Sequence, residues 1–253
     1  MATGTLLSLQ NVSHRYRTSG REVNALDQVD LDLRDGEFLV LVGASGCGKS
    51  TLLKIIAGLL DPTEGSLDRS PGLDERGGIG MVFQKPVLLP WRSVLRNVLV
   101  PTEVLRTDGA REAALGLIDS TGLAGFEDAY PHQLSGGMQQ RVAICRALLT
   151  DPPLLLMDEP FGALDAITRE RLNLLLQEIW SETRKTVVLV THNIDEAVLL
   201  GDRIVVMSPR PGRIVEVIEN DLPRPRGAHT YADPRFAELS VHLRAQIVGT
   251  DHE

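Results

Sequence analysis

Residues 43–50 of this 253-residue chain read GASGCGKS and fit the spacing G-x-x-x-x-G-K-[ST]. They stand between a continuously apolar run, which predicts a buried strand, and a helical pattern, which is the context that this motif requires. Backbone N–H groups of such a turn can wrap phosphates, Lys49 can reach the β and γ phosphates, and Ser50 can ligate Mg²⁺. The motif therefore predicts a nucleotide site rather than a glycine-rich turn that only packs.

Two carboxylates stand at the end of another apolar run. Residues 154–157 read LLLM and predict a buried strand, which delivers Asp158 and Glu159 at its carboxyl end. Open α/β sheets bind their ligands at that end of the strands. We therefore expect Asp158 to hold Mg²⁺, and Glu159 to take a proton from the attacking water or to orient it.

His192 and Gln84 also end short apolar runs, TVVLVTH and VFQ. Lone histidines are often structural, but a histidine at a strand end beside a phosphate loop is placed to contact a γ-phosphate. The amide of Gln84 can sense a metal ion or the attacking water. Both residues are therefore assigned to the nucleotide site.

Residues 134–141, LSGGMQQR, predict a second anion site. A serine and paired glycines at a helix start leave backbone N–H groups free and expose the positive end of the helix dipole, which favours a phosphate. The loop at 43–50 already serves the phosphates of its own chain. A second helix start of this kind can find its anion across a twofold interface with another subunit.

The hydropathy pattern predicts the elements that position these residues. The first forty residues alternate apolar and polar side chains, which is typical of antiparallel strands, here with a turn at 18–22. Short apolar runs then alternate with helical patterns, except that residues 91–150 are almost wholly helical. The sequence therefore predicts an α/β core with a helical insertion. The predicted buried strands are 37–43, 79–84, 153–160 and 186–192, the core helices are 48–60, 165–184 and 193–201, the hairpin strands are 203–208 and 213–218, and the helix of the tail is 234–247.

Composition narrows the classes of function. The net charge of −8, from 26 basic and 34 acidic residues, argues against a protein that binds nucleic acid by bulk electrostatics. Cys47 and Cys145 lack metal-ligand spacing and suit a reducing cytoplasm. Residues 1–10 lack the pattern of a signal peptide, and no apolar run approaches the roughly 18 residues of a membrane span. We therefore expect a soluble chain that reaches a membrane only through a partner.

In their order along the chain, these motifs resemble the ATP-binding subunit of ABC transporters. GASGCGKST corresponds to Walker A, Gln84 to the Q-loop, LSGGMQQR to the family signature, LLLMDEP to Walker B, GALD with Asp165 to the D-loop and His192 to the switch histidine. The resemblance implies a P-loop ATPase core with an N-terminal antiparallel β-subdomain and an inserted α-helical subdomain. It also implies ATP and Mg²⁺ as cofactors, and a dimer in which each signature faces the γ-phosphate of the ATP bound by the other subunit.

The resemblance assigns a role to each residue of these motifs. The implied nucleotide ligands are Tyr16, Gly43, Ala44, Ser45, Gly46, Cys47, Gly48, Lys49, Ser50, Thr51, Ser135, Gly136 and Gly137; the implied catalytic residues are Lys49, Gln84, Glu159 and His192; and the implied metal ligands are Ser50, Gln84 and Asp158.

The segments KPVLLPWRSVLRNV and MDEPFGALDAITR are similar to a subgroup of ABC importers, those for nitrate, sulfonates, taurine and related anions. This implies an energy-coupling ATPase on the cytoplasmic face of the inner membrane, with sulfonate or taurine favoured over nitrate as solute. The implied partners are a second copy or a close relative, two transmembrane permease subunits and an extracytoplasmic solute-binding protein, and no nucleic acid. The expected ATP-binding domain is 1–222, with its helical subdomain at about 85–152, and the tail is 223–253.

Some assignments have a second interpretation. His14 is a rival to Tyr16 as the residue that stacks on adenine. Trp91, after Pro90, either belongs to a docking surface for another protein or packs under its own loop. Cys47 is either a reactive thiol, favoured by the helix dipole and Lys49, or a small filler of the loop.

Two other functions fit parts of the pattern. A soluble ABC ATPase acting on nucleic acid or the ribosome usually carries two ATP modules, long coiled-coil insertions or zinc cysteines, and the sequence has none of these. A regulatory subunit without catalysis is expected to lack Glu159 or His192, and both are present.

Overall fold

The computed structural model describes residues 4–18, 20–162 and 164–249. The chain divides into two compact units, which we call unit 1 (Met1–Pro71 and Thr183–Glu253) and unit 2 (Gly72–Glu182). Ser19 of the predicted first turn and Ala163 of the predicted D-loop lie outside the described residues. The predicted fold class, an α/β core with an N-terminal antiparallel sheet, is confirmed. The predicted limits of the domain and the tail remain a prediction.

Unit 1 contains a small antiparallel sheet. Strands β1 (Thr5–Thr18) and β2 (Arg21–Arg34) pair in antiparallel register, as their alternating sequence predicts. Strand β4 (Glu64–Arg69) pairs with the other edge of β1. The sequence pattern does not predict β4, because the mostly exposed, polar residues of this strand give no apolar run.

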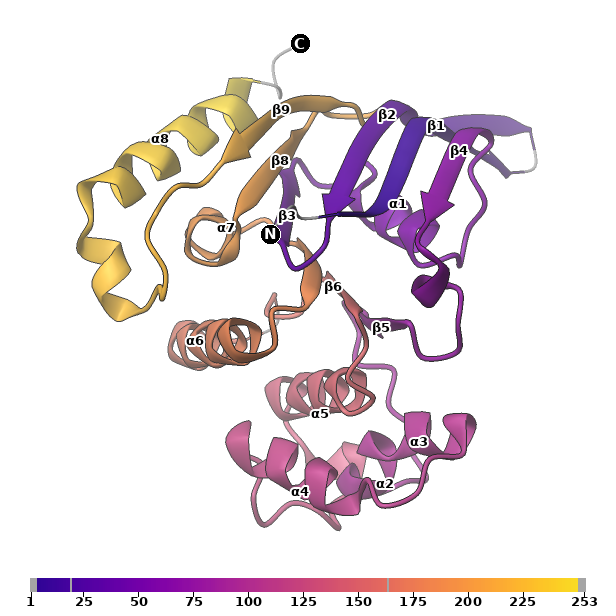
Figure 1. The fold of residues 1–253 in the computed structure, drawn as a ribbon, viewed down its shortest axis with the longest axis vertical. Coiled ribbons are helices and arrows are strands. Elements are labelled where there is room, and N and C mark those ends of the chain that lie inside the picture. Colours follow the sequence, from indigo (N-terminus) through magenta and orange to yellow (C-terminus); the bar gives the residue numbers. More distant parts are fainter. Residues whose placement is uncertain (1–3, 19, 163, 250–253) are drawn as a thin grey trace. The chain divides into compact units, whose positions relative to one another are not determined.

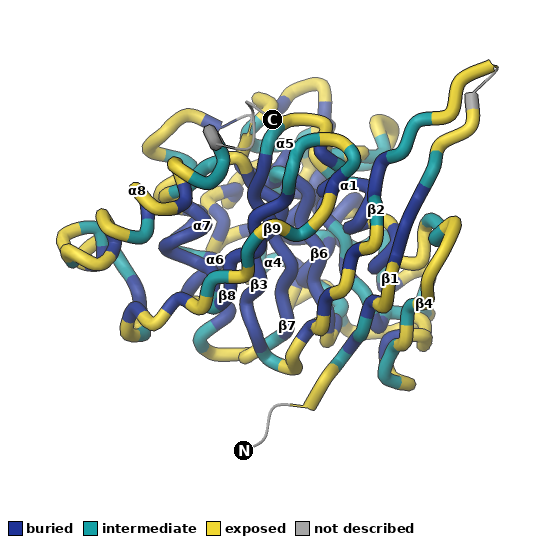
Figure 2. The backbone as a smooth tube through the Cα atoms, turned by 90° about the horizontal axis from the view of Figure 1, so that it is seen from above, coloured by how far each residue is buried: buried dark blue, intermediate teal, exposed yellow. Residues whose placement is uncertain are grey.

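Unit 1 also contains the strands that lead to the phosphate loop. Strand β3 (Phe38–Gly43) pairs in parallel with β7 (Thr186–Val190) and with β8 (Arg203–Met207), and β9 (Ile214–Glu219) pairs antiparallel with β8. Every residue of β3, β7 and β8 is buried, and these strands are dark blue in Figure 2. Continuous burial of parallel strands requires apolar runs of the kind seen in the sequence.

Three helices of unit 1 contact these strands. Helix α1 (Lys49–Ile56) contacts β3 and β7, α7 (Ile194–Leu200) contacts β3, and α8 (Pro234–Gly249) contacts β8 and α7. Figure 1 shows α8 alongside the hairpin of β8 and β9. The chain between β9 and α8 includes the short 3₁₀ helix Ala228–Ala232.

The buried Arg226, the partly buried Arg224 and the buried Asn220 attach the segment after β9 to the end of α7. Arg226 donates to the carbonyl of Gly201 at 2.6 Å, and Arg224 donates to that of Leu200 at 2.6 Å. Asn220 donates to the carbonyls of Val198 and Gly201, both at 2.8 Å. Burial lowers the pKa of Arg226 to about 10. These donors satisfy carbonyls that the last turn of a helix leaves without partners.

Unit 2 holds a parallel strand pair and a helical segment. Strands β5 (Ile79–Val82) and β6 (Leu154–Asp158) are parallel neighbours. Four α-helices separate these strands in the chain (Figure 1), and the first, third and fourth of them share a core that includes Val94, Ile118 and Val142. These helices are α2 (Val94–Val98), α3 (Val100–Leu105), α4 (Arg111–Ser120) and α5 (Gly136–Leu148); α6 (Ala166–Thr183) follows β6, and the 3₁₀ helices that precede α5 in the chain are Pro71–Leu73 and Pro131–Gln133.

Among the described residues, no helix is long and apolar enough to cross a membrane.

Candidate nucleotide site

The loop between β3 and α1 is built around glycines that no other residue can replace without strain. Gly43, Gly46 and Gly48 have φ values of +152°, +76° and +107°. A Cβ on Gly43 would lie 2.7 Å from the carbonyl oxygen of Met207, and one on Gly48 would lie 2.6 Å from that of Ala25. The close approach of neighbouring backbone therefore explains two glycines of the motif, in addition to their left-handed conformation.

Lys49 is held at this loop by the loop itself. It is only 5% exposed, and its Nζ donates to the carbonyl oxygens of Gly43 at 2.7 Å and of Ala44 at 2.8 Å. Lys49 is also the first residue of α1. Its ammonium group and the positive end of the helix dipole therefore act at the same place, which makes the loop a site for an anion.

Cys47 lies inside the loop. It is 1% exposed, and Lys49 Nζ lies 3.6 Å from its Sγ. A thiol with so little exposure is poorly accessible to an alkylating reagent. The structure therefore supports the interpretation of Cys47 as a small filler of the loop.

The two aromatic candidates for adenine stacking differ in exposure. The rings of His14 and Tyr16 pack edge to face, with their centroids 4.6 Å apart. His14 is 7% exposed and its Nδ1 lies 3.0 Å from the carbonyl oxygen of Asp61, whereas Tyr16 is 39% exposed and its hydroxyl lies 3.2 Å from Thr51 Oγ1. Tyr16 is thus the more accessible ring, and it is connected to the first turn of the helix that follows the phosphate loop.

His192 follows β7, the parallel neighbour of β3. The carboxyl ends of these two strands lie at the same edge, so unit 1 brings His192 and the phosphate loop to one side of the sheet. The next residue, Asn193, caps α7 by accepting from the N–H groups of Asp195 and Glu196 at 2.9 and 3.2 Å. The carboxylate of Glu196 in turn accepts from Thr191 Oγ1 at 2.5 Å.

Unit 2 brings the other predicted catalytic residues together. Because β5 and β6 are parallel neighbours, Gln84 and Glu159 emerge at the same edge, and Gln84 Nε2 donates to Glu159 Oε2 at 3.2 Å. Asp158, the last residue of β6, is 6% exposed. Glu159 has a φ of +45°, which is uncommon for a residue with a side chain and is typical of functional sites.

The signature segment also lies in unit 2, at the N-terminus of α5. Ser135 is the N-cap, and its Oγ accepts from the N–H of Met138 at 3.3 Å. Ser135 and Gly136 are exposed, and a Cβ on Gly136 would meet nothing within 4 Å. A Cβ on Gly137 would lie 2.8 Å from Leu164 Cδ2. A side chain at position 136 would therefore find free space, whereas one at position 137 would press on Leu164.

Each unit by itself offers oxygen donors of the kind that Mg²⁺ prefers. The described residues contain no group of three or more His, Cys, Asp or Glu side chains that could hold a metal ion. Unit 1 offers the hydroxyl of Ser50, and unit 2 offers the amide of Gln84 and the carboxylate of Asp158.

Two contacts of the site have no signal in the sequence. Arg210 in the turn between β8 and β9 donates to the carbonyl of Gly46 in the phosphate loop, and helix α5 holds the segment after β5. In the second contact, Gln140 donates to the carbonyl of Phe83 at 3.1 Å and Arg146 to that of Pro86 at 2.9 Å. The sequence marks the first segment as a turn, but it carries no signal of what that turn contacts.

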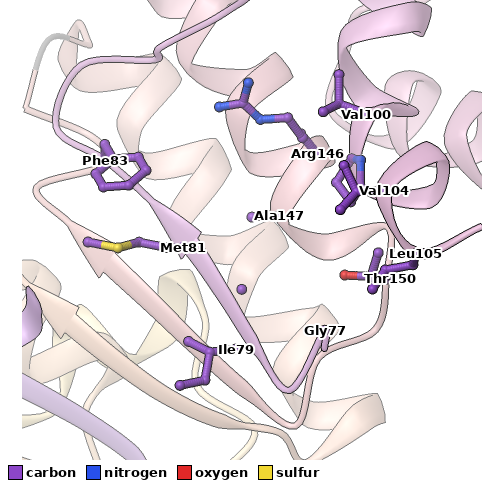
Figure 3. A pocket seen from close by; sticks show the side chains of 12 residues that line it. Gly77, Ile79, Met81, Phe83, Val100, Val104, Leu105, Arg146, Ala147 and Thr150 are labelled. Atoms are coloured by element: carbon purple, nitrogen blue, oxygen red, sulfur yellow. The ribbon is translucent and has the colours of Figure 1, made fainter. Parts of the chain in front are cut away.

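An apolar cavity of about 360 Å³ lies beside this segment in unit 2 (Figure 3). Met81 and Phe83 come from β5 and the residue following it, Val100 and Val104 come from α3, and Arg146 comes from α5. Nearby in the sequence, Trp91 is 70% exposed and therefore does not pack under its own loop. Its neighbour Arg92 pairs with Glu103 of α3 at 2.7 Å.

The fold and these two sets of residues define a nucleotide-binding α/β protein with a phosphate loop. The family model described as ABC transporter matches residues 26–162. The chain belongs to the ABC transporter family, as an ATP-binding subunit with ATPase activity.

Individual relatives match over most of the chain. The taurine import ATP-binding protein TauB of Rhizobium johnstonii is 48% identical, with 92% of both chains covered. The aliphatic sulfonates import ATP-binding protein SsuB of Bacillus cereus is 45% identical over 96% of this chain and 98% of the relative. A solved structure of the ATP-binding cassette MJ0796, dimeric and bound to ADP and Pi after hydrolysis, is similar with a TM-score of 0.75 and 38% identity, over 84% of this chain and 98% of that one.

Proposed function

We propose that this chain is the energy-coupling ATPase of an importer for small sulfonates such as taurine. Two copies would act together on two membrane subunits, at the cytoplasmic face of the membrane, and an extracytoplasmic protein would deliver the solute. The support for the solute class is the similarity over almost the whole length to relatives named for taurine and aliphatic sulfonate import.

Within one chain, the phosphate loop would bind the phosphates of ATP. Lys49 would exchange its bonds to the loop carbonyls for bonds to the β and γ phosphates, and the N–H groups of the loop would hold the β-phosphate. Tyr16 would stack on adenine. Mg²⁺ held by Ser50, Gln84 and Asp158 would neutralise charge on the phosphate oxygens.

Hydrolysis would depend on Glu159. Its carboxylate would accept a proton from the attacking water, and His192 would contact the γ-phosphate. The bond from Gln84 Nε2 to Glu159 Oε2 fixes the direction of that carboxylate. Ser135, Gly136 and Gly137 would complete the site of the other subunit by binding its γ-phosphate at a helix N-terminus.

One observation supports the proposal that hydrolysis is coupled to transport. The short segment 81–84 connects the apolar cavity to the catalytic residues. Met81 and Phe83 line the cavity, and Gln84 bonds Glu159. A membrane subunit that inserts an apolar side chain into this cavity would therefore move Gln84 when it moves. Arg146 ties the continuation of the segment to α5, the helix that begins with the signature.

The exposed apolar residues of unit 2 are consistent with docking at this place. Val87, Trp91 and Val104 are 60%, 70% and 65% exposed. Aromatic and aliphatic side chains that protrude from a surface are typical anchors of protein interfaces. We assign this surface to the membrane subunits.

The experiment is a reconstitution of this chain with the membrane subunits and the solute-binding protein of its importer. ATPase activity should rise severalfold with taurine or another small sulfonate and should not rise with nitrate. Glu159→Gln in the same assembly provides the baseline without hydrolysis. Stimulation by nitrate alone would contradict the proposed solute class, and stimulation by nucleic acid without membrane subunits would contradict the transport function.

A further inference from the structure

The turn between β8 and β9, residues 208–213, contacts the phosphate loop directly. Gly212 lies so close to the loop that a Cβ there would stand 2.0 Å from the carbonyl oxygen of Cys47. The N–H of Gly212 donates to the carbonyl of Ala25, and its carbonyl accepts from the N–H of Asp27, both at 3.0 Å. The turn is therefore fastened to β2 and forms a wall of the loop.

Arg210 reaches from this wall to the exposed tip of the phosphate loop. Its Nε and Nη2 donate to the carbonyl oxygen of Gly46 at 3.3 and 3.1 Å. Gly46 has a φ of +76°, in the left-handed region. The planar guanidinium presents its N–H groups in a fixed arrangement, so it favours one orientation of the peptide that follows Gly46.

Holding the Gly46 carbonyl also directs the next N–H group. A peptide unit is planar, and its C=O and N–H point in opposite directions. With the carbonyl bound to Arg210, the N–H of Cys47 points across the loop and lies 3.3 Å from the carbonyl oxygen of Ala44. Lys49 Nζ donates to the same oxygen at 2.8 Å. The Cys47 N–H and the Lys49 ammonium group thus converge on one point inside the loop.

We propose that Arg210 is a positioning residue of the nucleotide site. Through the Gly46 carbonyl it directs the Cys47 N–H toward the β-phosphate, and its positive charge adds to that of Lys49 in attracting the anion. The inference rests on the proposed role of residues 43–51 in binding phosphate. It predicts an effect on nucleotides with a β-phosphate, ATP and ADP alike, and little effect on AMP.

The test measures the affinity of the full chain for ATP, ADP and AMP. Arg210→Ala should weaken binding of ATP and ADP by about 5- to 10-fold each. AMP affinity and kcat at saturating ATP should stay within about twofold, because the group acts on binding alone. Arg213→Ala is the matched control: it removes a second arginine of the same turn, which forms an exposed ion pair with Asp27 and should contribute little.

Arg210→Lys separates the charge from the guanidinium. It keeps the charge but offers a single nitrogen in place of the two that bond the Gly46 carbonyl, so its affinity for ADP should lie between those of the wild type and Arg210→Ala. Unchanged ADP affinity in Arg210→Ala would overturn the inference, as would an equal loss in Arg213→Ala. A loss for ATP much larger than for ADP would also overturn it, since the guanidinium would then act on the γ-phosphate. If Lys49→Ala keeps full affinity for ADP, the proposed phosphate site itself is wrong. If Lys49→Ala loses ADP affinity while Arg210→Ala keeps it, only the inference about Arg210 is refuted.

Discussion

The chain has two glycine-rich helix starts, and they are built in opposite ways. The first, before α1, has glycines in the left-handed region, backbone oxygens close to where the Cβ atoms of Gly43 and Gly48 would be, and a lysine that donates to carbonyls of the loop. The second, before α5, has an exposed serine and an exposed glycine, and a Cβ on that glycine would have no neighbour within 4 Å. The first start is enclosed by its own chain, and the second faces outward.

We propose that this difference reflects the ligand that each helix start serves. An enclosed loop with its own cation can bind a phosphate without help from another molecule. An open helix start exposes N–H groups to whatever approaches from outside, and its glycine leaves room for that approach. The difference supports the proposal that the first start binds ATP within the chain and that the second acts on the ATP of another subunit.

The largest effect should come from placing a carboxylate on the open start. In a Glu159→Gln background, wild-type loops should allow an ATP-bound dimer to accumulate, and Gly136→Asp should prevent it. Two like charges about 4 Å apart at a partly dry interface cost about 4 kcal/mol. Light scattering of the isolated chain, or cross-linking in the assembled transporter, measures the dimer.

Gly136 is the better position for this test than Gly137, because a side chain at 137 would also press on Leu164. ATP affinity of the monomeric Gly136→Asp chain should stay within about twofold of the wild type. A tenfold loss there, about 1.4 kcal/mol, would mean that the open start serves its own chain.

Lys49→Ala should have the opposite pattern. It removes the cation of the enclosed loop, so the monomer should lose ATP affinity by about 100-fold or more, the equivalent of about 3 kcal/mol. Isothermal titration of the full chain with ADP and ATP gives the value. If Lys49→Ala and Gly136→Asp lower the ATP affinity of the monomer equally, the two helix starts do not differ in the way proposed.

Replacing a glycine by alanine should change the free energy of unfolding differently at the two helix starts. Gly48→Ala places a side chain at a φ of +107° and 2.6 Å from a backbone oxygen, so we expect a loss of about 2 kcal/mol or more in the free energy of unfolding. Gly136→Ala lies in a helix with open space around it and should be neutral or stabilising by up to about 1 kcal/mol. Urea unfolding measures both.

The sequence predicted the residues of both starts, because glycine, serine and lysine at fixed spacing carry their chemistry locally. It also predicted the strands that deliver Asp158 and His192, since their apolar runs are continuous. It could not choose between His14 and Tyr16, because the choice depends on burial against residues far along the chain, such as Asp61 and Thr51.

The missed features share a physical cause. Strand β4 is polar and gains its structure from pairing with β1, and Arg210 gains its role from a carbonyl far away in the sequence. Neither depends on a local pattern. The openness of Gly136 and the enclosure of Gly48 are likewise properties of their neighbours, although in the sequence each is simply a glycine at a predicted helix start.

The smallest effect concerns Ser135, which has a structural role and a proposed functional one. As the N-cap of α5 it accepts from the Met138 N–H at 3.3 Å, and Ser135→Ala should cost about 1 kcal/mol in unfolding free energy. Ser135→Asp keeps a capping oxygen and adds a charge that the helix dipole favours, so its stability should match or slightly exceed that of the wild type. Closure of the ATP-bound dimer should rank the two variants in the opposite order to stability. Ser135→Asp should close less than Ser135→Ala, because the added carboxylate would face a γ-phosphate. If closure instead follows stability, Ser135 is only a cap, and the open start takes its anion from other groups.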